Sequence, residues 1–337
     1  MKLIRTEEAV GHTLCHDHTR IVRGGDKGPA FRKGHIVRPR DIPGLLAMGK
    51  EHLYVWEQQA GMLHENDAAQ ILYELCAGPY MRPSGVKEGK IDVLADLDGL
   101  LRVDVEKLRA VNSLGGMMVA ARHTHSPVKR GDKLAGTRVI PLVIEEEKMA
   151  RARALGGGAP ILQLHPYKLK KAGVITTGSE VQKGLVQDAF TPVLQEKLAE
   201  VGMERAAHAT LGDEAGPMTE TILQMAAQGA DIVLCTGGMS VDPDDKTPLA
   251  IKSTGADIVT YGAPVLPGAM FLLAYYNGVP VMGLPGCVMY AARTIFDMMM
   301  ARAMADVPIA AEGIAALGHG GLCLGCPTCI YPACAYG

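Results

Sequence analysis

The sequence predicts an α/β protein built around a doubly wound parallel sheet, preceded by a mixed, β-rich domain and followed by a short cysteine-rich tail. Three observations predict this organisation. Apolar runs alternate with helical patterns from Lys171 onward, which is typical of a parallel sheet with helices on both faces. The residues before this point form short strand-like runs separated by turns. Four of the eight cysteines follow residue 322.

Length and composition indicate a folded chain with more than one domain. The 337 residues exceed the usual size of a single hydrophobic core. A hydrophobic fraction of 48% and a charged fraction of 21% are too apolar for a disordered chain. The net charge of -2 provides no general field that would attract nucleic acid or an anionic membrane. We therefore expect neither partner, and any anion site must be local.

We expect three domains, over residues 1–165, 166–305 and 306–337. The glycine run at 156–160 marks the first boundary, because consecutive glycines favour neither helix nor strand. In the β-rich N-terminal domain we expect strands at 116–122 and 137–144, with helices near 41–48 and 66–76.

The α/β domain has clear expected elements. Apolar runs predict strands at 172–177, 205–210, 231–236, 256–261 and 279–284. Helical spacing predicts helices at 189–201, 217–228, 248–253 and 288–304. In such sheets ligands bind outside the carboxyl ends of the strands, so the loops at those ends are the candidate site.

The loop after the strand at 231–236 carries the strongest signal for a binding site. It reads TGGMSVDPDDKTP over residues 236–248. Its glycines let backbone N–H groups approach an anion, and a following helix adds a favourable partial charge. The nearby acids would repel a bare phosphate, so the pattern predicts a bridging divalent cation, most simply Mg²⁺, with Asp245 as its first ligand. The alternative is that Asp244 and Asp245 only cap the next helix.

Three further loops are expected at the same edge of the sheet. The first, at 177–180, carries Glu180, and the second, at 211–214, carries Asp213. Converging carboxylates suit metal binding or proton transfer, although either acid alone is also typical of a strand-to-helix turn. The fourth loop, at 284–288, contains Gly286, which either brings backbone close to a ligand or serves a plain turn.

Together these loops resemble the molybdopterin-binding domain shared by molybdopterin adenylyltransferases and molybdopterin molybdotransferases, over residues 169–305. The two glycines followed by the D-x-T-P segment at 245–248 are similar to the adenylyltransferase version. The Met-Ser-Val segment at 239–241 is similar to the molybdotransferase version.

The resemblance implies a site for molybdopterin and its phosphate, Mg²⁺, and either ATP or adenylylated molybdopterin with molybdate. Position by position, it makes Asp245 and Asp213 the acidic, metal-binding and catalytic residues, and Glu180 the acid of the first loop. The implied contacts to cofactor are Thr236, Gly237, Gly238, Ser240, Thr177, Gly178, Pro285 and Gly286. It also implies a homo-oligomer.

Two departures from the family pattern leave more than one function open. Ser179 stands where the family has Asp, and Cys287 stands where the molybdotransferases have Asn. Losing a carboxylate weakens an oxygen-rich metal site. The resemblance therefore implies a transferase that handles molybdate insertion, or a non-catalytic carrier that hands the cofactor to a client molybdoenzyme. A third reading is a nucleotide hydrolase that shares the fold, releasing AMP.

The tail contains a second strong motif, with the spacing C-x2-C-x2-C-x4-C formed by Cys323, Cys326, Cys329 and Cys334. Four thiolates this close in sequence can close around Zn²⁺ or an iron–sulfur cluster. Gaps of two residues favour the cluster, whereas structural zinc more often uses two separated pairs. The alternative is a flexible tail whose thiols never meet.

Histidines and targeting signals add weaker expectations. His16 with His18, and His123 with His125, alternate as metal ligands on one strand face would, which is also the pattern of any exposed strand. No apolar segment typical of a secretion signal begins the sequence, and prolines interrupt the uncharged stretch at 263–292. We expect a cytoplasmic protein.

Overall fold

The computed structural model describes residues 2–20, 28–55, 60–240 and 245–337. The chain divides into two compact units. The first contains Met1–Asp96, Val103–Thr124 and Arg130–Leu164, and the second contains Leu97–Arg102, His125–Lys129 and His165–Gly337. The cysteine-rich tail forms part of the second unit. The expected boundaries at 165 and 306 stay a prediction.

The second unit is built on a six-stranded sheet with the order β15-β14-β16-β19-β18-β17. Its strands are β14 (Lys171–Thr177), β15 (Glu204–Leu211), β16 (Ile232–Thr236), β17 (Asp257–Tyr261), β18 (Leu272–Tyr276) and β19 (Val279–Leu284). The first three and β19 pair in parallel, while β18 runs antiparallel between β17 and β19. The predicted α/β fold class is confirmed. The strand β18 escaped prediction because it lies inside the proline- and glycine-rich stretch.

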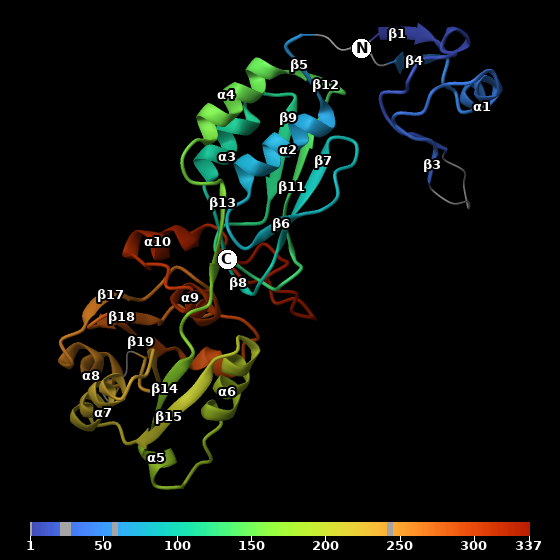
Figure 1. Ribbon diagram of the computed structural model, residues 1–337. Helices are drawn as coiled ribbons and strands as arrows, with labels where there is room; N and C mark the ends of the chain where they lie inside the picture. Colours follow the sequence, from blue (N-terminus) through green and yellow to red (C-terminus); the bar gives the residue numbers. More distant parts are fainter. Residues whose placement is uncertain (1, 21–27, 56–59, 241–244) are drawn as a thin grey trace. The chain divides into compact units, whose positions relative to one another are not determined.

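Helices cover both faces of this sheet, as a doubly wound fold requires. They are α5 (Ser179–Gln182), α6 (Phe190–Glu200), α7 (Ala215–Ala227), α8 (Thr247–Ser253), α9 (Ile295–Met304) and α10 (Ala311–Ala315). One buried cluster joins α6 and α9 to strand residues such as Val174 and Leu234. A second joins α7 and α8 to Ile175 and Val233, and Figure 1 shows α7 and α8 on the other side of the strands from α6.

The burial pattern follows from this layering. All five residues of β16 are buried, because a central parallel strand has a helix layer on each face. The edge strand β15 instead alternates between exposed and half-buried residues. A central strand thus appears in the sequence as a continuous apolar run, and an edge strand as an alternating one.

Two predicted elements are split, each for a local reason. The helix expected at 288–304 is a 3₁₀ turn, η3 (Gly286–Met289), followed by α9. The Thr294 side chain accepts a hydrogen bond from Phe296 N–H, and Asp297 accepts one from Thr294 N–H, so this capping box starts a new helix. The strand expected at 137–144 is β11 (Lys133–Val139) and β12 (Val143–Glu145), with Pro141 between them.

The first unit contains a four-stranded antiparallel sheet with the order β6-β7-β11-β9. Its other strands are β6 (Met81–Pro83), β7 (Lys90–Ala95) and β9 (Met117–Ala121). The helices α2 (Glu65–Cys76), α3 (Val105–Asn112) and α4 (Glu146–Gly156) pack on the sheet and on one another (Figure 1). A separate pair of strands joins β12 to β5 (Met62–His64).

The N-terminal part of the first unit has its own small core. The strand β1 (Lys2–Arg5) pairs with β4 (His52–Val55), and β2 (His18–Arg20) pairs with β3 (Gly28–Phe31). The helix α1 (Ile42–Ala47) contributes Leu45 to an apolar cluster that also contains residues of β1 and β4.

Three short strands outside the six-stranded sheet complete the description. The strand β8 (Gly99–Val103) pairs antiparallel with β10 (Ser126–Val128), and Leu100 packs against Ala301 of α9. The strand β13 (Leu162–Pro166) lies beside β8. Among the described helices, none has the length and apolar character that crossing a membrane requires.

Candidate functional site

The four parallel strands end at the same level of the sheet. Thr177 of β14 pairs with Leu211 of β15, Thr176 pairs with Thr236 of β16, and Thr236 pairs with Leu284 of β19. Because the carboxyl ends of the strands are in register, the loops that follow them lie side by side. Their order across the edge is second, first, third and fourth, and we call this the four-loop edge.

The third loop holds two glycines in the left-handed region of backbone space. The φ angle is +84° at Gly237 and +55° at Gly238. A Cβ atom on Gly237 would lie 2.5 Å from Thr177 Oγ1 and 2.6 Å from the Thr177 carbonyl oxygen. Glycine is therefore required at position 237 for both its backbone conformation and its close approach to the first loop.

Two threonine side chains hold this glycine turn in place. Thr247 Oγ1 donates to the Gly237 carbonyl oxygen at 2.9 Å, and Thr177 Oγ1 donates to the Thr236 carbonyl oxygen at 3.0 Å. Both threonines are buried. Thr177 belongs to the first loop and Thr247 to the third. The structure brings both side chains to the backbone at the end of β16.

The rest of the third loop rests on β19. A Cβ atom on Gly283 would lie 2.5 Å from Met239 Sδ, so the methionine packs directly over the strand. Ser240 is exposed and Asp245 is half-buried. Residues 241–244, which include Asp244, lie outside the described residues.

Two hydrogen bonds donated by backbone N–H groups of the first loop connect it to the second loop. Gly178 N–H donates to the Leu211 carbonyl oxygen at 3.1 Å, and Ser179 N–H donates to Asp213 Oδ2 at 2.9 Å. Glu180 turns toward its own chain, because a Cβ atom on Gly178 would lie 3.0 Å from Glu180 Oε1. One oxygen of Asp213 therefore supports the first loop at Ser179, the residue that stands where the family has Asp.

The expected convergence of Glu180, Asp213 and Asp245 into one metal site stays a prediction. Within the described ranges, no three His, Cys, Asp or Glu side chains come together in a group that could hold a metal ion. The strand β14 lies between β15 and β16, so the strands that precede Asp213 and Asp245 are not neighbours in the sheet.

The fourth loop supplies the other end of the edge. Pro285 is buried, whereas Gly286 is exposed and has open space where a side chain would be. Cys287 is half-buried, and this burial raises the pKa of its thiol. Gly286 therefore leaves room at this position without being required by the local backbone.

A buried ion pair that sequence reasoning missed anchors the segment after the fourth loop. Lys197 Nζ lies 3.0 Å from Asp297 Oδ1, and both side chains are less than a tenth exposed. Lys197 Nζ also donates to the Ala292 carbonyl oxygen at 2.7 Å, and Arg293 bonds to Asp297 Oδ1 at 3.0 Å. No local motif could reveal a pair separated by 100 residues.

A second missed polar group lies beside β14. Thr176 Oγ1 is 2.8 Å from Thr191 Oγ1 and 3.1 Å from His208 Nε2. Burial lowers the pKa of His208, so the neutral imidazole is favoured. Asp188 accepts hydrogen bonds from two backbone N–H groups at the start of α6, including that of Thr191. This network connects α6 to the sheet below the first loop.

The tail cysteines are all reduced and differ in burial. Cys323 and Cys334 are half-buried and pack against the core of the second unit, whereas Cys326 and Cys329 are exposed. Among the described residues, which include the whole tail, no three potential metal ligands lie close enough together to hold an ion. The predicted four-thiolate centre is therefore not closed in this conformation.

The predicted histidine pairs give a mixed result. His16 and His18 have ring centroids 4.4 Å apart, and His18 is buried on β2. Considering only described residues, both ring nitrogens of His18 lack a hydrogen-bond partner. Burial lowers the pKa of His18 to about 4. The expected strand placement of His123 and His125 is wrong, since both lie in the turn between β9 and β10.

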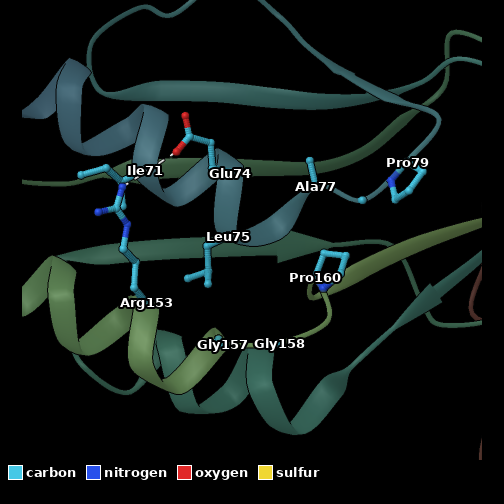
Figure 2. A pocket seen from close by; sticks show the side chains of 11 residues that line it. Ile71, Glu74, Leu75, Ala77, Pro79, Arg153, Gly157, Gly158 and Pro160 are labelled. Carbon is cyan, nitrogen blue, oxygen red and sulfur yellow. Dashed lines mark ion pairs between the residues drawn. The ribbon is translucent and has the colours of Figure 1, made fainter.

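A cavity of about 450 Å³ opens in the first unit, where α2 and α4 end (Figure 2). Its charged lining residues are Glu74 and Arg153, which form an ion pair at 3.9 Å with both side chains more than half exposed. The rest of its lining is apolar side chains and glycine backbone. The cavity contains none of the predicted site residues, so the four-loop edge stays the candidate site.

Comparison with known proteins finds family models that match part of each unit. Residues 173–306 match the family model "Probable molybdopterin binding domain", and residues 3–57 match a domain of unknown function. CinA-like proteins of Mycobacterium sp. (strain JLS) and Mycobacterium tuberculosis (strain ATCC 25618 / H37Rv) are 36% identical over 77 residues, or 23% of this chain. The matched stretch spans 18% of the length of these relatives.

Solved structures align with the same part of the chain. The protein CinA from Thermoplasma acidophilum is 19% identical with a TM-score of 0.34, covering 40% of this chain and 98% of that one. The molybdopterin biosynthesis enzyme MoaB from Thermus thermophilus is 18% identical with a TM-score of 0.33, covering 42% and 99%. By the family match, the chain contains over residues 173–306 a domain of the molybdopterin-binding family.

Proposed function

We propose that the four-loop edge binds molybdopterin or its adenylylated form, and that the protein handles the molybdate insertion step of molybdenum cofactor biosynthesis. The observation that carries the proposal is the glycine turn of the third loop. Gly237 and Gly238 present backbone without side chains at the level ends of the strands, and Thr177 and Thr247 hold that backbone. The family match over the same residues supports this ligand.

The glycine turn suits a phosphate-bearing ligand because backbone can approach the anion closely. In the proposal, Thr236, Gly237 and Gly238 contact the phosphate, and Ser240 extends this contact from its exposed position. Thr177 and Gly178 form the adjoining wall, and Pro285 and Gly286 close the far end. The open space at Gly286 supports its placement against a ligand.

Asp245 is the proposed Mg²⁺ ligand. Mg²⁺ is usually bound through one or two carboxylates together with substrate phosphates, and seldom by a cage made only of protein groups. The separation of Asp213 from Asp245 agrees with that arrangement, in which the ligand's phosphate completes the site. The ion would neutralise phosphate charge during transfer. Asp213 supports the first loop through Ser179 N–H, and Glu180 lies next to it.

A carrier that hands the cofactor to a client molybdoenzyme is the second candidate. Ser179 favours the carrier, because this residue replaces a carboxylate of the family. Its backbone N–H group also donates a hydrogen bond to one carboxylate oxygen of Asp213. Binding through backbone and glycines survives that change, whereas metal-dependent transfer depends on the number of carboxylates. The two candidates share the binding site and differ in turnover.

The substitution Asp245→Asn tests the proposal. With purified full-length protein, adenylylated molybdopterin, Mg²⁺ and molybdate, we expect AMP release to fall about 100-fold or more, because the carboxylate that holds the ion is lost. The circular dichroism spectrum should not change, since Asp245 is only half-buried. Asp257→Asn, an exposed acid on the edge strand β17, is the matched control and should keep full activity.

Other outcomes separate the candidates. Equal turnover in Asp245→Asn and in the unmodified chain would contradict the proposed ligand. Retention of a fluorescent oxidised pterin without any AMP release would favour the carrier. Release of AMP from a dinucleotide in the absence of pterin would favour the nucleotide hydrolase.

A further inference from the structure

We propose that the four tail cysteines bind a thiophilic metal centre, either zinc or an iron–sulfur cluster, in a pocket beside the fourth loop. All four line one cavity of about 300 Å³ in the second unit. The rest of its wall includes Pro267, Arg293 and Tyr331. Thiols that are spread over a dozen residues of chain therefore face a common space, although they are not yet close enough to share an ion.

The donor set selects the class of metal. The side chains lining the cavity include four thiols, and no carboxylate or imidazole is among them. Thiolate ligands favour zinc and iron–sulfur clusters, whereas Mg²⁺ and Ca²⁺ require oxygen ligands. The same pocket therefore excludes the ion proposed for the four-loop edge.

Backbone hydrogen bonds hold one side of the pocket. Cys323 N–H donates to the Leu266 carbonyl oxygen at 2.8 Å, and Leu266 N–H donates to the Gly321 carbonyl oxygen at 2.8 Å. At the other end of the tail, Gly337 N–H donates to the Gly320 carbonyl oxygen at 3.2 Å, and Tyr336 is buried. Cys323 and Cys334 are thus fixed against the core before any metal binds.

The other side is free to close. Cys326 and Cys329 are exposed, and so is the turn between them. Gly325 precedes this turn with a φ of +65°, and no atom lies within 4 Å of the Cβ it lacks. The turn can therefore move toward Cys323 and Cys334 without displacing packed side chains. Metal binding commonly supplies the free energy for such local ordering.

Part of the pocket wall comes shortly after the fourth loop in the chain. Ala291, Ala292 and Arg293 line the pocket, and one residue separates them from η3, which contains Cys287. Lys197 Nζ holds the Ala292 carbonyl oxygen, so this wall is fixed by the buried ion pair. A metal centre here would order the tail next to the four-loop edge. The inference is independent of the proposed function, because it depends only on the thiols.

The test measures metal in full-length protein purified without oxygen after expression with zinc and iron supplied. We expect a stoichiometric amount of one metal, with visible charge-transfer absorption if it is an iron–sulfur cluster and none if it is zinc. The double variant Cys326→Ser/Cys329→Ser should lose the metal. Both positions are exposed, so the variant should fold, which circular dichroism verifies.

Thr328→Ala, which changes the exposed residue between these cysteines, is the matched control and should keep the metal. Thiol titration gives a second readout: the tail thiols should be protected in the loaded protein and become reactive when a chelator removes the metal. Metal-free protein under these conditions, or a double variant that keeps its metal, would overturn the inference. Neither result would bear on pterin binding at the four-loop edge.

Discussion

Two buried polar sites, one in each unit, are arranged in opposite ways. In the second unit, Lys197 is paired with Asp297, and the threonines of the four-loop edge donate to backbone carbonyl oxygens. In the first unit, His18 is buried and, among the described residues, its ring nitrogens have no hydrogen-bond partner. The first arrangement holds charge through pairing, while the second excludes it.

The difference shows what each region can tolerate. A buried charge pair is costly to break, because removing one partner leaves the other charge without it. A buried neutral imidazole without a hydrogen-bond partner has no partner to lose. When the pH falls, however, burial opposes its protonation, because the charged ring is disfavoured away from water. The second unit should therefore be sensitive to substitution and the N-terminal strands of the first unit to acid.

The largest expected effect is from breaking the buried pair. Lys197→Met should lower the free energy of unfolding by about 3–5 kcal/mol, because the buried Asp297 would lose its buried partner and be left with the more exposed Arg293. Urea denaturation measures the change. Lys168→Met, which breaks an ion pair to Asp306 with both side chains more than half exposed, is the control and should cost less than about 1 kcal/mol.

Adding Asp297→Asn to Lys197→Met should recover part of the loss, since the carboxylate that lost its buried partner is removed. Equal effects of Lys197→Met and Lys168→Met would show that burial of the pair contributes nothing, and the contrast between the units would fail.

The second prediction concerns acid. The pKa of His18 is lowered to about 4 in the folded chain, below its ordinary value of 6.5, because burial disfavours the charged ring. Between these values the unfolded chain binds more protons, so stability falls as the pH drops from about 6.5 to 4. The total loss should be up to about 3 kcal/mol.

Hydrogen exchange at the amides of β1, β2 and β4 follows this loss locally. The variant His18→Leu, which cannot be protonated, is the control and should show a weaker pH dependence of exchange. If both proteins respond equally to acid, other groups cause the effect.

The smallest expected effect tests the four-loop edge. Gly237→Ala should destabilise the second unit by about 1–3 kcal/mol, because the new methyl group would overlap Thr177 and the residue has a φ of +84°. Gly286→Ala is the matched control, with open space and no left-handed backbone, and thermal unfolding should hardly change. Similar unfolding temperatures for the two variants would mean that the glycine turn is not held as tightly as described.

The α/β fold could be predicted because its signals are local. The continuous apolar runs that became β14, β16 and β19 need only the rule that buried parallel strands are apolar throughout. The strand β18 was missed because its apolar run lies among prolines and glycines that usually indicate loops. The break before α9 was missed because a capping box marks where a helix begins, and hydrophobic periodicity does not record that position.

The candidate site could be predicted only in part. The glycines at 237 and 238 were identified correctly as a special turn, since few other residues adopt their backbone conformation. The grouping of Asp213 with Asp245 in one metal site stays a prediction. The sequence could not show that β14 lies between their strands, because strand order is decided by which strands pair.

The sequence by itself determined the class of fold, the four loops and the cysteine motif, because these depend on residue types at short spacing. Tertiary structure alone decided that Thr177 supports the third loop, that Lys197 meets Asp297, and that the tail thiols face one cavity. The first two are contacts between residues far apart in the chain. The third depends on the directions of the cysteine side chains, which packing decides. Such contacts form only once the sheet has fixed the order of its strands.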